Sequence, residues 1–408
     1  MPEADRATSL PPAYWRLWWA AAVDNVGDGA FATAVPLLAV TITHDPRAIS
    51  IVSAATFLPW VLLSLPAGAI IDRRDRVSLM WWSQALQAVL VGVLAVLVAA
   101  GAVSVPVLAV LAFGLGAGDV VFGNAAQAVL PEIVPEPLLH KANGKQYTIS
   151  NIGQLFLGPP LGSLLFATAV ALPFGVDAGS FALSAVLLAT LPHRPRTVAA
   201  HPPIRTAVRD GVRWLARHRL LRTLALLLSV NTFCFQLGNV TLVLLATRTL
   251  HLGTRGYGLL LAGAAVGSVL GGVVNARIVA RIGALPALIV ALGSNVFIFA
   301  ALGLSPDDVM LGLLLGMNGF VTTLWSIVTV SLRQKVVPTE LLGRVNSVYR
   351  MLGWGLMPAG AVTGGLIAHE FGVRAGYPIA GAVRGIALIA ALPVLIGAVR
   401  AVTADEST

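Results

Sequence analysis

Long, mostly apolar runs constrain the fold of this chain more than any other feature of its sequence. A helix needs about 20 mostly apolar residues to cross a bilayer, and runs of this length follow one another along almost the whole chain. None alternates apolar and polar residues as a barrel strand does, so helices are the expected spanning elements. Twelve segments are predicted to span a membrane: 14–43, 48–71, 77–101, 104–130, 142–170, 173–192, 220–247, 256–280, 284–304, 308–332, 343–368 and 375–399.

The composition agrees with an all-α polytopic membrane protein. Apolar residues make up 57% of the chain and charged residues only 11%, whereas soluble domains carry about 25% charged residues. The 41 glycines are typical of closely packed membrane helices. The net charge of +9 is dispersed through the loops, so it does not indicate nucleic-acid binding.

The distribution of lysine and arginine predicts the orientation of the chain. With both termini in the cytoplasm, most of the 27 cations fall in cytoplasmic segments, as the positive-inside rule requires. The outer loops then keep only Arg47, Arg248, Arg255 and Arg374. We therefore expect a multi-pass monomer in the plasma (bacterial inner) membrane.

A basic loop over 193–219 divides the chain into two halves. From Ile204 onward its apolar residues have helical spacing, which predicts an amphipathic helix on the inner leaflet; a solvated basic linker is the alternative. We expect an N-terminal six-helix bundle over 1–192, this cytoplasmic linker, and a C-terminal six-helix bundle over 220–408.

Short motifs recur in the two halves. Gly68-Ala-Ile-Ile-Asp72 matches Gly271-Gly-Val-Val-Asn275, and Val134-Pro135 matches Val337-Pro338 at the same separation. Two matches at one separation indicate a duplicated half. Because each half has an even number of spans, the copies would be related by an axis along the membrane normal, which is typical of transporters.

These features together resemble the major facilitator superfamily. The charged turn after the second span is similar to that family's Gly-x-x-x-Asp-Arg-x-x-Arg loop at Gly68, Asp72, Arg73 and Arg76, with Asp75 where the family often has glycine. The resemblance implies the major facilitator fold, in which two pseudo-symmetric six-helix bundles alternate the access of a central site.

Further motifs are similar to one branch of that superfamily. Gly158-Pro159-Pro160-x-Gly162 in the fifth span resembles the Gly-Pro-x-x-Gly pattern of drug:proton antiporters. Asp24-Asn-Val-Gly-Asp28-Gly and Leu130-Pro-Glu-Ile-Val-Pro resemble the subgroup that includes the enterobactin exporter and macrolide-efflux proteins. The resemblance implies an exporter, with Gly158, Pro159 and Gly162 as its antiporter-like helix.

The resemblance also implies a gate around the charged turn. Asp72 would contact the electropositive N-terminus of span 11 and hold one facing state, with Gly68 allowing close helix approach. Arg350, inside span 11, needs a carboxylate or carbonyl partner, for which Asp72 and Asp119 are candidates. We therefore expect Gly68, Asp72, Arg73, Arg76 and Arg350 to form the gate; the alternative is a turn that only fixes topology.

Carboxylates inside the spans are the expected centre of the chemistry. Asp24 and Asp28 are one helical turn apart and share a face of span 1, near the bilayer midplane. Two close carboxylates in a poorly hydrated cavity cannot both ionise at low cost, so they are expected to bind and release protons, with Asp119 of span 4 as a second site. A structural role for any of them is the alternative. Asp177, near the start of span 6 and the outer surface, is expected to cap its helix or to lie at the membrane interface.

Uncharged polar and aromatic residues within the spans are predicted to line the substrate cavity. Interhelical hydrogen bonds and packing are the alternative for each of them. The predicted cavity residues are Asn25, Phe31, Asn231, Gln236, Asn239, Asn318 and Trp325.

The sequence has no arrangement typical of an enzyme. It lacks a phosphate-binding Gly-x-x-x-x-Gly-Lys-Ser/Thr loop, and its seven histidines have no metal-ligand spacing, so no cofactor or metal is expected. We predict proton-coupled efflux of a small, largely apolar compound such as a drug, antibiotic or siderophore. The expected partners are that substrate, protons and the lipid bilayer, without nucleic acid. An importer, a lysophospholipid flippase and a non-transporting sensor or assembly protein are the alternatives.

Overall fold

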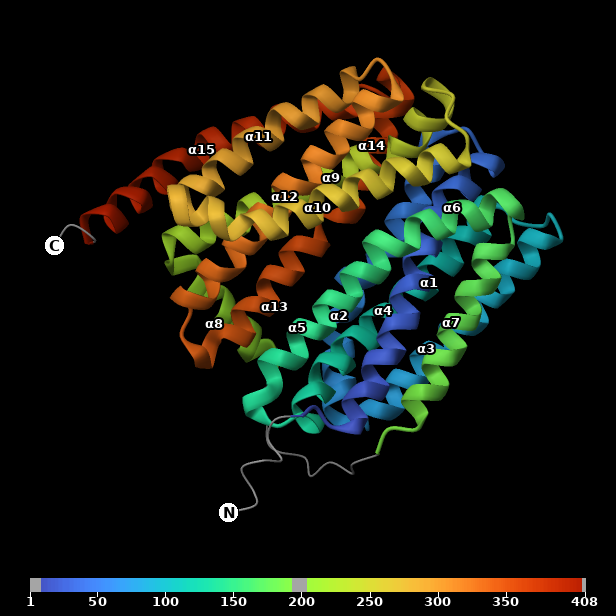
Figure 1. Ribbon diagram of the computed structural model, residues 1–408, viewed down its shortest axis with the longest axis horizontal. Coiled ribbons are helices and arrows are strands. Elements are labelled where there is room, and N and C mark those ends of the chain that lie inside the picture. Colours follow the sequence, from blue (N-terminus) through green and yellow to red (C-terminus); the bar gives the residue numbers. More distant parts are fainter. Residues whose placement is uncertain (1–8, 193–203, 406–408) are drawn as a thin grey trace. The chain divides into compact units, whose positions relative to one another are not determined.

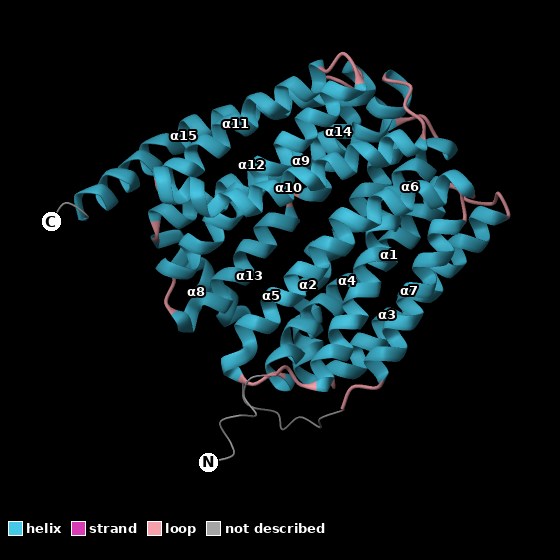
Figure 2. Ribbon diagram, in the orientation of Figure 1, coloured by secondary structure: helices cyan, strands magenta, loops and turns pink. Residues whose placement is uncertain are grey.

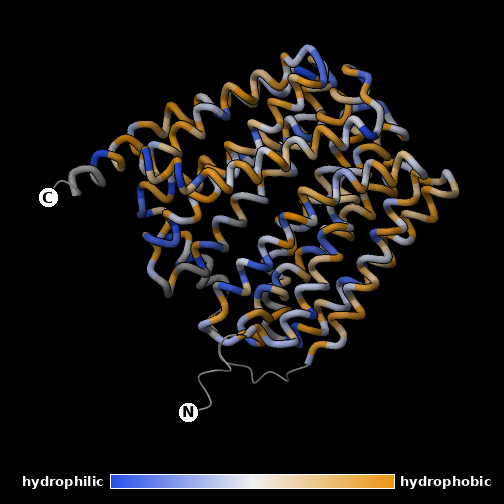
Figure 3. The backbone as a smooth tube through the Cα atoms, viewed as in Figure 1, coloured by the Kyte–Doolittle hydropathy of each residue, from blue (hydrophilic) through white to orange (hydrophobic). Residues whose placement is uncertain are grey.

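The computed structural model describes residues 9–192 and 204–405 of the chain. These residues form helices joined by short loops, and no strand occurs among them (Figure 2). Apolar residues run along the length of the long helices (Figure 3). The all-α fold predicted from the sequence is therefore confirmed. Residues 193–203, the first part of the predicted linker, lie outside the described residues.

The chain forms two compact units. The N-terminal unit comprises residues 1–43 and 55–201, and the C-terminal unit comprises 44–54 and 202–408. The short segment 44–54 belongs to the C-terminal unit, in which Gln236 Nε2 donates a hydrogen bond to Ser53 Oγ at 2.6 Å.

Figure 1 labels most of the elements in chain order. The elements up to the basic loop are α1 (Pro12–Ile42), α2 (Pro46–Arg73), α3 (Arg76–Ala99), α4 (Val105–Ile133), η2 (Glu136–Leu138), α5 (Leu139–Asn151), η3 (Ile152–Leu157), α6 (Gly158–Thr168) and α7 (Leu172–Ala189). Those that follow are α8 (Ile204–Arg217), α9 (Arg219–Leu244), η4 (Leu245–Thr249), α10 (Thr254–Ile282), α11 (Ala284–Leu304), α12 (Asp308–Val336), α13 (Thr339–Gly355), α14 (Met357–Phe371) and α15 (Gly376–Asp405).

The two units repeat the same helix pairings. In the N-terminal unit α1 packs against α6 and α7, and α3 packs against α4 and α7. In the C-terminal unit α9 packs against α14 and α15, and α11 packs against α12 and α15. Two units with matching pairings confirm the pseudo-symmetric architecture predicted from the repeated motifs.

Among the described residues, eleven helices are long and apolar enough to cross a membrane. The predicted span over 142–170 is not among them, although α5, η3 and α6 follow one another without a gap. The total of twelve crossings therefore stays a prediction.

Two prolines account for the π-helical stretch η3 between α5 and α6. Pro159 and Pro160 have no N–H group, so the carbonyls one turn earlier lose their α-helical donors. The chain responds with the π-helical stretch η3, at whose end the Gly158 N–H donates to the Gly153 carbonyl. Such stretches occur mostly as short insertions within α-helices.

Glycines bring helix backbones into direct contact at matching places in both units. A Cβ on Gly158 of α6 would lie 2.4 Å from Gly29 Cα of α1, and a Cβ on Gly162 would lie 2.3 Å from the Ala30 carbonyl oxygen. In the C-terminal unit, a Cβ on Gly360 of α14 would lie 2.4 Å from the Phe233 carbonyl oxygen of α9. These helix pairs therefore tolerate no side chain at the contact, which gives the antiporter-like glycines a packing role.

Helix α8 lies within the predicted amphipathic segment. Its Gly211 and Leu215 are buried, and a Cβ on Gly211 would lie 2.9 Å from the Arg344 carbonyl oxygen of α13. Arg344 also pairs with Asp210 at 3.2 Å. One face of α8 thus packs on α13, while Val212 is exposed; the position of this helix on the inner leaflet stays a prediction.

Candidate functional site

Asp24 lies on α1 in the interior of the N-terminal unit. Only 4% of the residue is exposed, and its Oδ2 accepts a hydrogen bond from Gln84 Nε2 of α3 at 3.0 Å. Its other oxygen, Oδ1, is buried without a hydrogen-bond partner. Gln84 is itself fully buried, and its Oε1 also has no partner. The amide and the carboxyl group that meet here therefore each keep one oxygen that can take part in a further hydrogen bond.

A second pair repeats this arrangement one turn along α3. Gln87 Nε2 donates to Asp119 Oδ1 of α4 at 2.6 Å, and Gln87 Oε1 is buried without a partner. Gly118 makes room for the glutamine, because a Cβ on it would lie 2.6 Å from Gln87 Cδ. The two glutamines are three residues apart and face the same side of α3.

Asp177 on α7 is the most deeply buried of the carboxylates, with no exposed surface. Its Oδ1 accepts from Ser180 Oγ at 3.2 Å, and its Oδ2 has no partner. The side chain fits against α1 because Gly27 leaves space there: a Cβ on Gly27 would lie 2.4 Å from Asp177 Oδ1. The predicted helix cap at Asp177 is wrong, because α7 begins at Leu172 and Ala171 occupies the cap position.

Asp28 lies between these groups. It is half-buried on α1 and within electrostatic range of the carboxylates of Asp24, Asp119 and Asp177. Among the described residues, no lysine, arginine or histidine hydrogen-bonds or ion-pairs with any of the four. We call these four aspartates, together with Gln84 and Gln87, the acid cluster.

The acid cluster can hold protons. Removing carboxylates from water disfavours their charged form, and so do neighbouring negative charges. An amide can serve both states of a carboxyl group, because its N–H groups donate to a carboxylate and its carbonyl accepts from a carboxylic acid. Rotation of the Gln84 or Gln87 amide can therefore follow the gain or loss of a proton.

The predicted cavity residues do not all come together. Phe31 meets Phe174 edge to face at 5.8 Å between ring centroids, and Asn25 Nδ2 donates to the Ala21 carbonyl of its own helix at 2.6 Å. Gln236 is bonded to Ser53, as described above, and Asn239 is exposed. Phe31, Asn25, Gln236 and Asn239 therefore each lie among different neighbours.

Two predicted cavity residues join a polar network in the C-terminal unit. The buried Asn318 accepts from Asn295 Nδ2 at 3.1 Å, and the Asn231 carbonyl accepts from Arg384 Nη2 at 3.0 Å. Asn295 connects the two, because its Oδ1 accepts from Arg384 Nη1. Trp325 is also buried, with its indole N–H unpartnered.

The charged turn has a local structural role at two of its residues. Gly68, Asp72 and Arg73 lie in the last turns of α2, and the structure does not describe their side chains or that of Arg350. Asp75 caps α3 by accepting from the Ser78 N–H at 2.7 Å. The gating contacts of Gly68, Asp72, Arg73 and Arg350 therefore stay a prediction.

Arg76 is anchored to the end of α4. Its Nη1 donates to Glu132 Oε1 and to the Ala128 carbonyl, each at 2.6 Å. The side chain of Arg76 is 13% exposed and that of Glu132 is 36% exposed. These bonds fix the start of α3 against α4 within the N-terminal unit.

We expect Arg76→Gln to lower the stability of the protein by roughly 1–2 kcal/mol, because it removes charge-assisted bonds from a mostly buried group. Thermal unfolding of the purified protein, followed by tryptophan fluorescence, measures the effect. Arg74→Gln is the matched control, since Arg74 is exposed in the same turn. Equal unfolding midpoints for the two variants would show that the anchor contributes nothing.

Sequence reasoning missed several members of these networks. Gln84, Gln87, Ser180 and Asn295 were not singled out, yet each is a polar residue in an otherwise apolar helix. The available signal was spacing: Gln84 and Gln87 are three residues apart, as are Asp177 and Ser180. Such pairs place two polar groups on one face of a membrane helix, where they meet polar groups of a neighbouring helix.

Comparisons with known proteins agree with this architecture. The chain is 29% identical over 378 residues to the multidrug efflux pump Tap of Mycolicibacterium fortuitum, covering 88% of this chain and 90% of that protein. It is 22% identical over 379 residues to macrolide efflux protein A of Streptococcus pyogenes, covering 90% and 92%. Both matches extend over almost the full length of the proteins compared.

Solved structures share the fold. The nucleoside transporter NupG superposes with a TM-score of 0.76 at 13% identity, covering 94% of this chain and 99% of that one. A bacterial homologue of the iron transporter ferroportin, in an inward-facing state, superposes with a TM-score of 0.69 at 19% identity, covering 93% and 100%. At these identities the likeness establishes the fold alone.

A family model matches the chain from residue 10 to residue 407, and it is described as transmembrane secretion effector. This span includes both units and every helix of the acid cluster. The chain is therefore a multi-pass membrane transporter of small molecules, and it belongs to the transmembrane secretion effector family of the major facilitator superfamily.

Proposed function

We propose that this transporter exports a small, largely apolar compound in exchange for protons. One observation carries the proposal: four aspartates lie together in the N-terminal unit, three of them have amide or hydroxyl partners, and none pairs with a cation among the described residues. A purely structural core gains nothing from such groups, and intramembrane ionisable residues mark ion and substrate pathways. The efflux relatives support export and an apolar substrate.

Asp24, Asp28 and Asp119 hold the exchanged proton in this proposal, and Asp177 is a fourth member of the group. When the site is closed to water, the carboxylates keep a proton because they cannot all be charged at low cost. When the site opens to the side of lower proton concentration, water enters and the proton leaves. A substrate that enters the same site competes with the proton, which gives exchange by alternating access.

The remaining roles follow the predicted orientation, with both termini in the cytoplasm of a bacterial cell and the chain acting as a monomer. Asn25, Phe31, Asn231, Gln236, Asn239, Asn318 and Trp325 contribute to the substrate path. Gly68, Asp72, Arg73, Arg76 and Arg350 control the gate. The packing of Gly158 and Gly162 holds α6 on α1.

Everted membrane vesicles that contain the protein test the proposal. A proton gradient with an acidic vesicle interior is imposed, so that protons flow outward, and uptake is measured for a panel of fluorescent dyes, antibiotics, siderophores and a fluorescent lysophospholipid. We expect uptake of at least one apolar compound that stops when a protonophore collapses the gradient. Vesicles from cells without the protein give the background.

The panel also separates the rival activities. Protonophore-resistant uptake would contradict proton coupling. Accumulation only in right-side-out vesicles would identify an importer, and movement of the lysophospholipid alone would identify a flippase. A non-transporting sensor or assembly role does not fit the family to which the chain belongs.

A further inference from the structure

Arg384 is a buried cation in the middle of the C-terminal unit. It lies on α15, and only 7% of the residue is exposed. Its Nη1 donates to Asn295 Oδ1 of α11, and its Nη2 donates to the Asn231 carbonyl of α9. Its Cζ lies 3.6 Å from the centroid of the Phe299 ring. Three helices therefore hold the guanidinium in a fixed position.

All of these partners are electrically neutral. The Cys234 side chain also interacts with the guanidinium, and a thiol is uncharged at neutral pH in ordinary surroundings. Among the described residues, no carboxylate forms an ion pair with Arg384. A buried charge without a counter-ion is strongly disfavoured unless something neutralises it.

The sequence of this unit explains the missing counter-ion. Its membrane-spanning helices have no acidic residue in their central parts. Among the described residues of this unit, Asp210 lies in α8, and the other acidic residues lie in loops or in the terminal turns of helices: Asp45, Asp307, Asp308, Glu340, Glu370 and Asp405. Asp45 and Asp210 already pair with Arg47 and Arg344.

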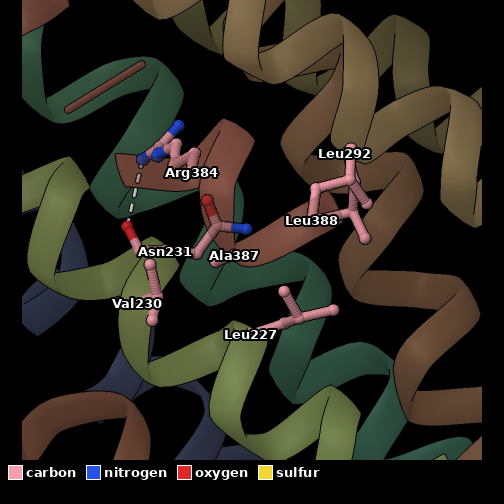
Figure 4. Close-up of a pocket in the computed structure, with 7 residues that line it drawn as sticks. All are labelled: Leu227, Val230, Asn231, Leu292, Arg384, Ala387 and Leu388. Carbon is pink, nitrogen blue, oxygen red and sulfur yellow. Dashed lines mark hydrogen bonds between the residues drawn. The ribbon is translucent and has the colours of Figure 1, made fainter. Parts of the chain in front are cut away.

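Arg384 is one of the residues that line a small cavity in this unit (Figure 4). The cavity has room for about one water molecule, and its walls are apolar except for Arg384 and Asn231. Arg384 Nε is buried and has no hydrogen-bond partner, so one N–H donor and the uncompensated charge remain available. The lining residues are Leu227, Val230, Asn231, Leu292, Arg384, Ala387 and Leu388.

We propose that this cavity is a binding site for a monovalent anionic group. One negative charge neutralises the single positive charge of Arg384. The small volume of the cavity excludes a bulky anion, and its apolar walls favour a weakly hydrated anion. The chemistry fits chloride and equally the carboxylate of a small organic compound. Only the second source rests on the proposed function, because the carboxylate would then belong to the transported molecule.

An equilibrium measurement on the purified full chain tests the site without any transport. Thermal unfolding in detergent is followed at constant ionic strength while sodium gluconate, a bulky hydrated anion, is replaced by sodium chloride or by sodium formate, the smallest carboxylate. A ligand that binds only the folded state raises the unfolding midpoint with a saturable dependence on concentration. We expect such a rise with chloride, with formate, or with both in competition. Formamide, an uncharged analogue of formate, should have no effect.

Two variants locate the effect. Arg384→Gln removes the charge and should abolish the rise. Asn295→Asp keeps the shape of the side chain and places a carboxylate against Arg384, so it should abolish the rise even if Arg384→Gln does not fold. Arg281→Gln, at an exposed arginine in the last turn of α10, should leave it unchanged.

The outcomes are distinct. A rise with chloride alone assigns the site to an inorganic anion, and a rise with formate assigns it to an organic carboxylate. No saturable rise with either anion, or an undiminished rise in Asn295→Asp, overturns the proposal. None of these results depends on proton-driven efflux. A failure of the anion site can therefore be distinguished from a failure of the proposed function in vesicles.

Discussion

Replacing Asp24 and Asp28 together by asparagine is expected to reduce proton-driven efflux to the level of vesicles that lack the protein. Asparagine keeps the shape of the side chain and can still bond Gln84, so the fold should survive. It cannot gain or lose a proton, however, and the remaining pair of Asp119 and Asp177 has lost its two nearest acidic neighbours on α1. Exchange of substrate down its own gradient should continue, because that reaction needs no proton.

Proton release measured directly separates coupling from binding. The purified protein is placed in weakly buffered detergent solution with a pH-sensitive dye, and substrate is added. We expect release from the wild type and from Glu370→Gln, a control that removes an exposed carboxylate, but not from the double variant. Release of undiminished size in the double variant would remove Asp24 and Asp28 from the proton path.

Alanine at Gly158 is expected to destabilise the protein, although alanine is the better helix former. Its Cβ would lie within 3 Å of three backbone atoms of Gly29 and Ala30, and backbone cannot rotate away as a side chain can. The helices α1 and α6 must separate instead, which costs roughly 1–3 kcal/mol as for other overpacked sites. The midpoint of thermal unfolding should fall accordingly.

Gly175→Ala is the matched control for this change. Gly175 is also helical, on α7, but a Cβ there meets no atom within 4 Å. The same substitution should therefore raise stability by up to about 1 kcal/mol, from helix propensity alone. Opposite signs for the two variants support the packing explanation. A loss of transport in Gly158→Ala with unchanged stability would instead favour a direct role of this motif in antiport.

The fold could be predicted from the sequence because two simple patterns determine it. Apolar runs of membrane length mark the helices, and the recurrence of the Gly68 and Val134 motifs in the second half marks the repeat. The π-helical stretch η3 in the fifth span was not predicted. Its cause, the adjacent prolines Pro159 and Pro160, was visible, but the motif was interpreted by its resemblance to antiporters rather than by its missing N–H donors.

The candidate site could be predicted only in part. Asp24, Asp28 and Asp119 stand out because acids are rare in apolar runs. Asp177 was misplaced, since its depth was counted from the helix end, whereas Gly27 on a different helix creates the space that buries it. Which glutamine meets which acid depends on how helices rotate against each other, and one sequence does not contain that information.

The π-helical stretch η3 has a mechanical consequence for the helix that contains it. A regular helix transmits a push or a twist from end to end, because each turn is bonded to the next. At η3 the regular bonding is interrupted beside two prolines, so α-helical bonds do not couple the parts before and after it. Both parts are instead fixed to α1: α6 by glycine contacts, and α5 by the Tyr14 hydroxyl, which donates to the Ala142 carbonyl at 3.0 Å. A displacement of either part is therefore transmitted through α1 rather than along the interrupted helix.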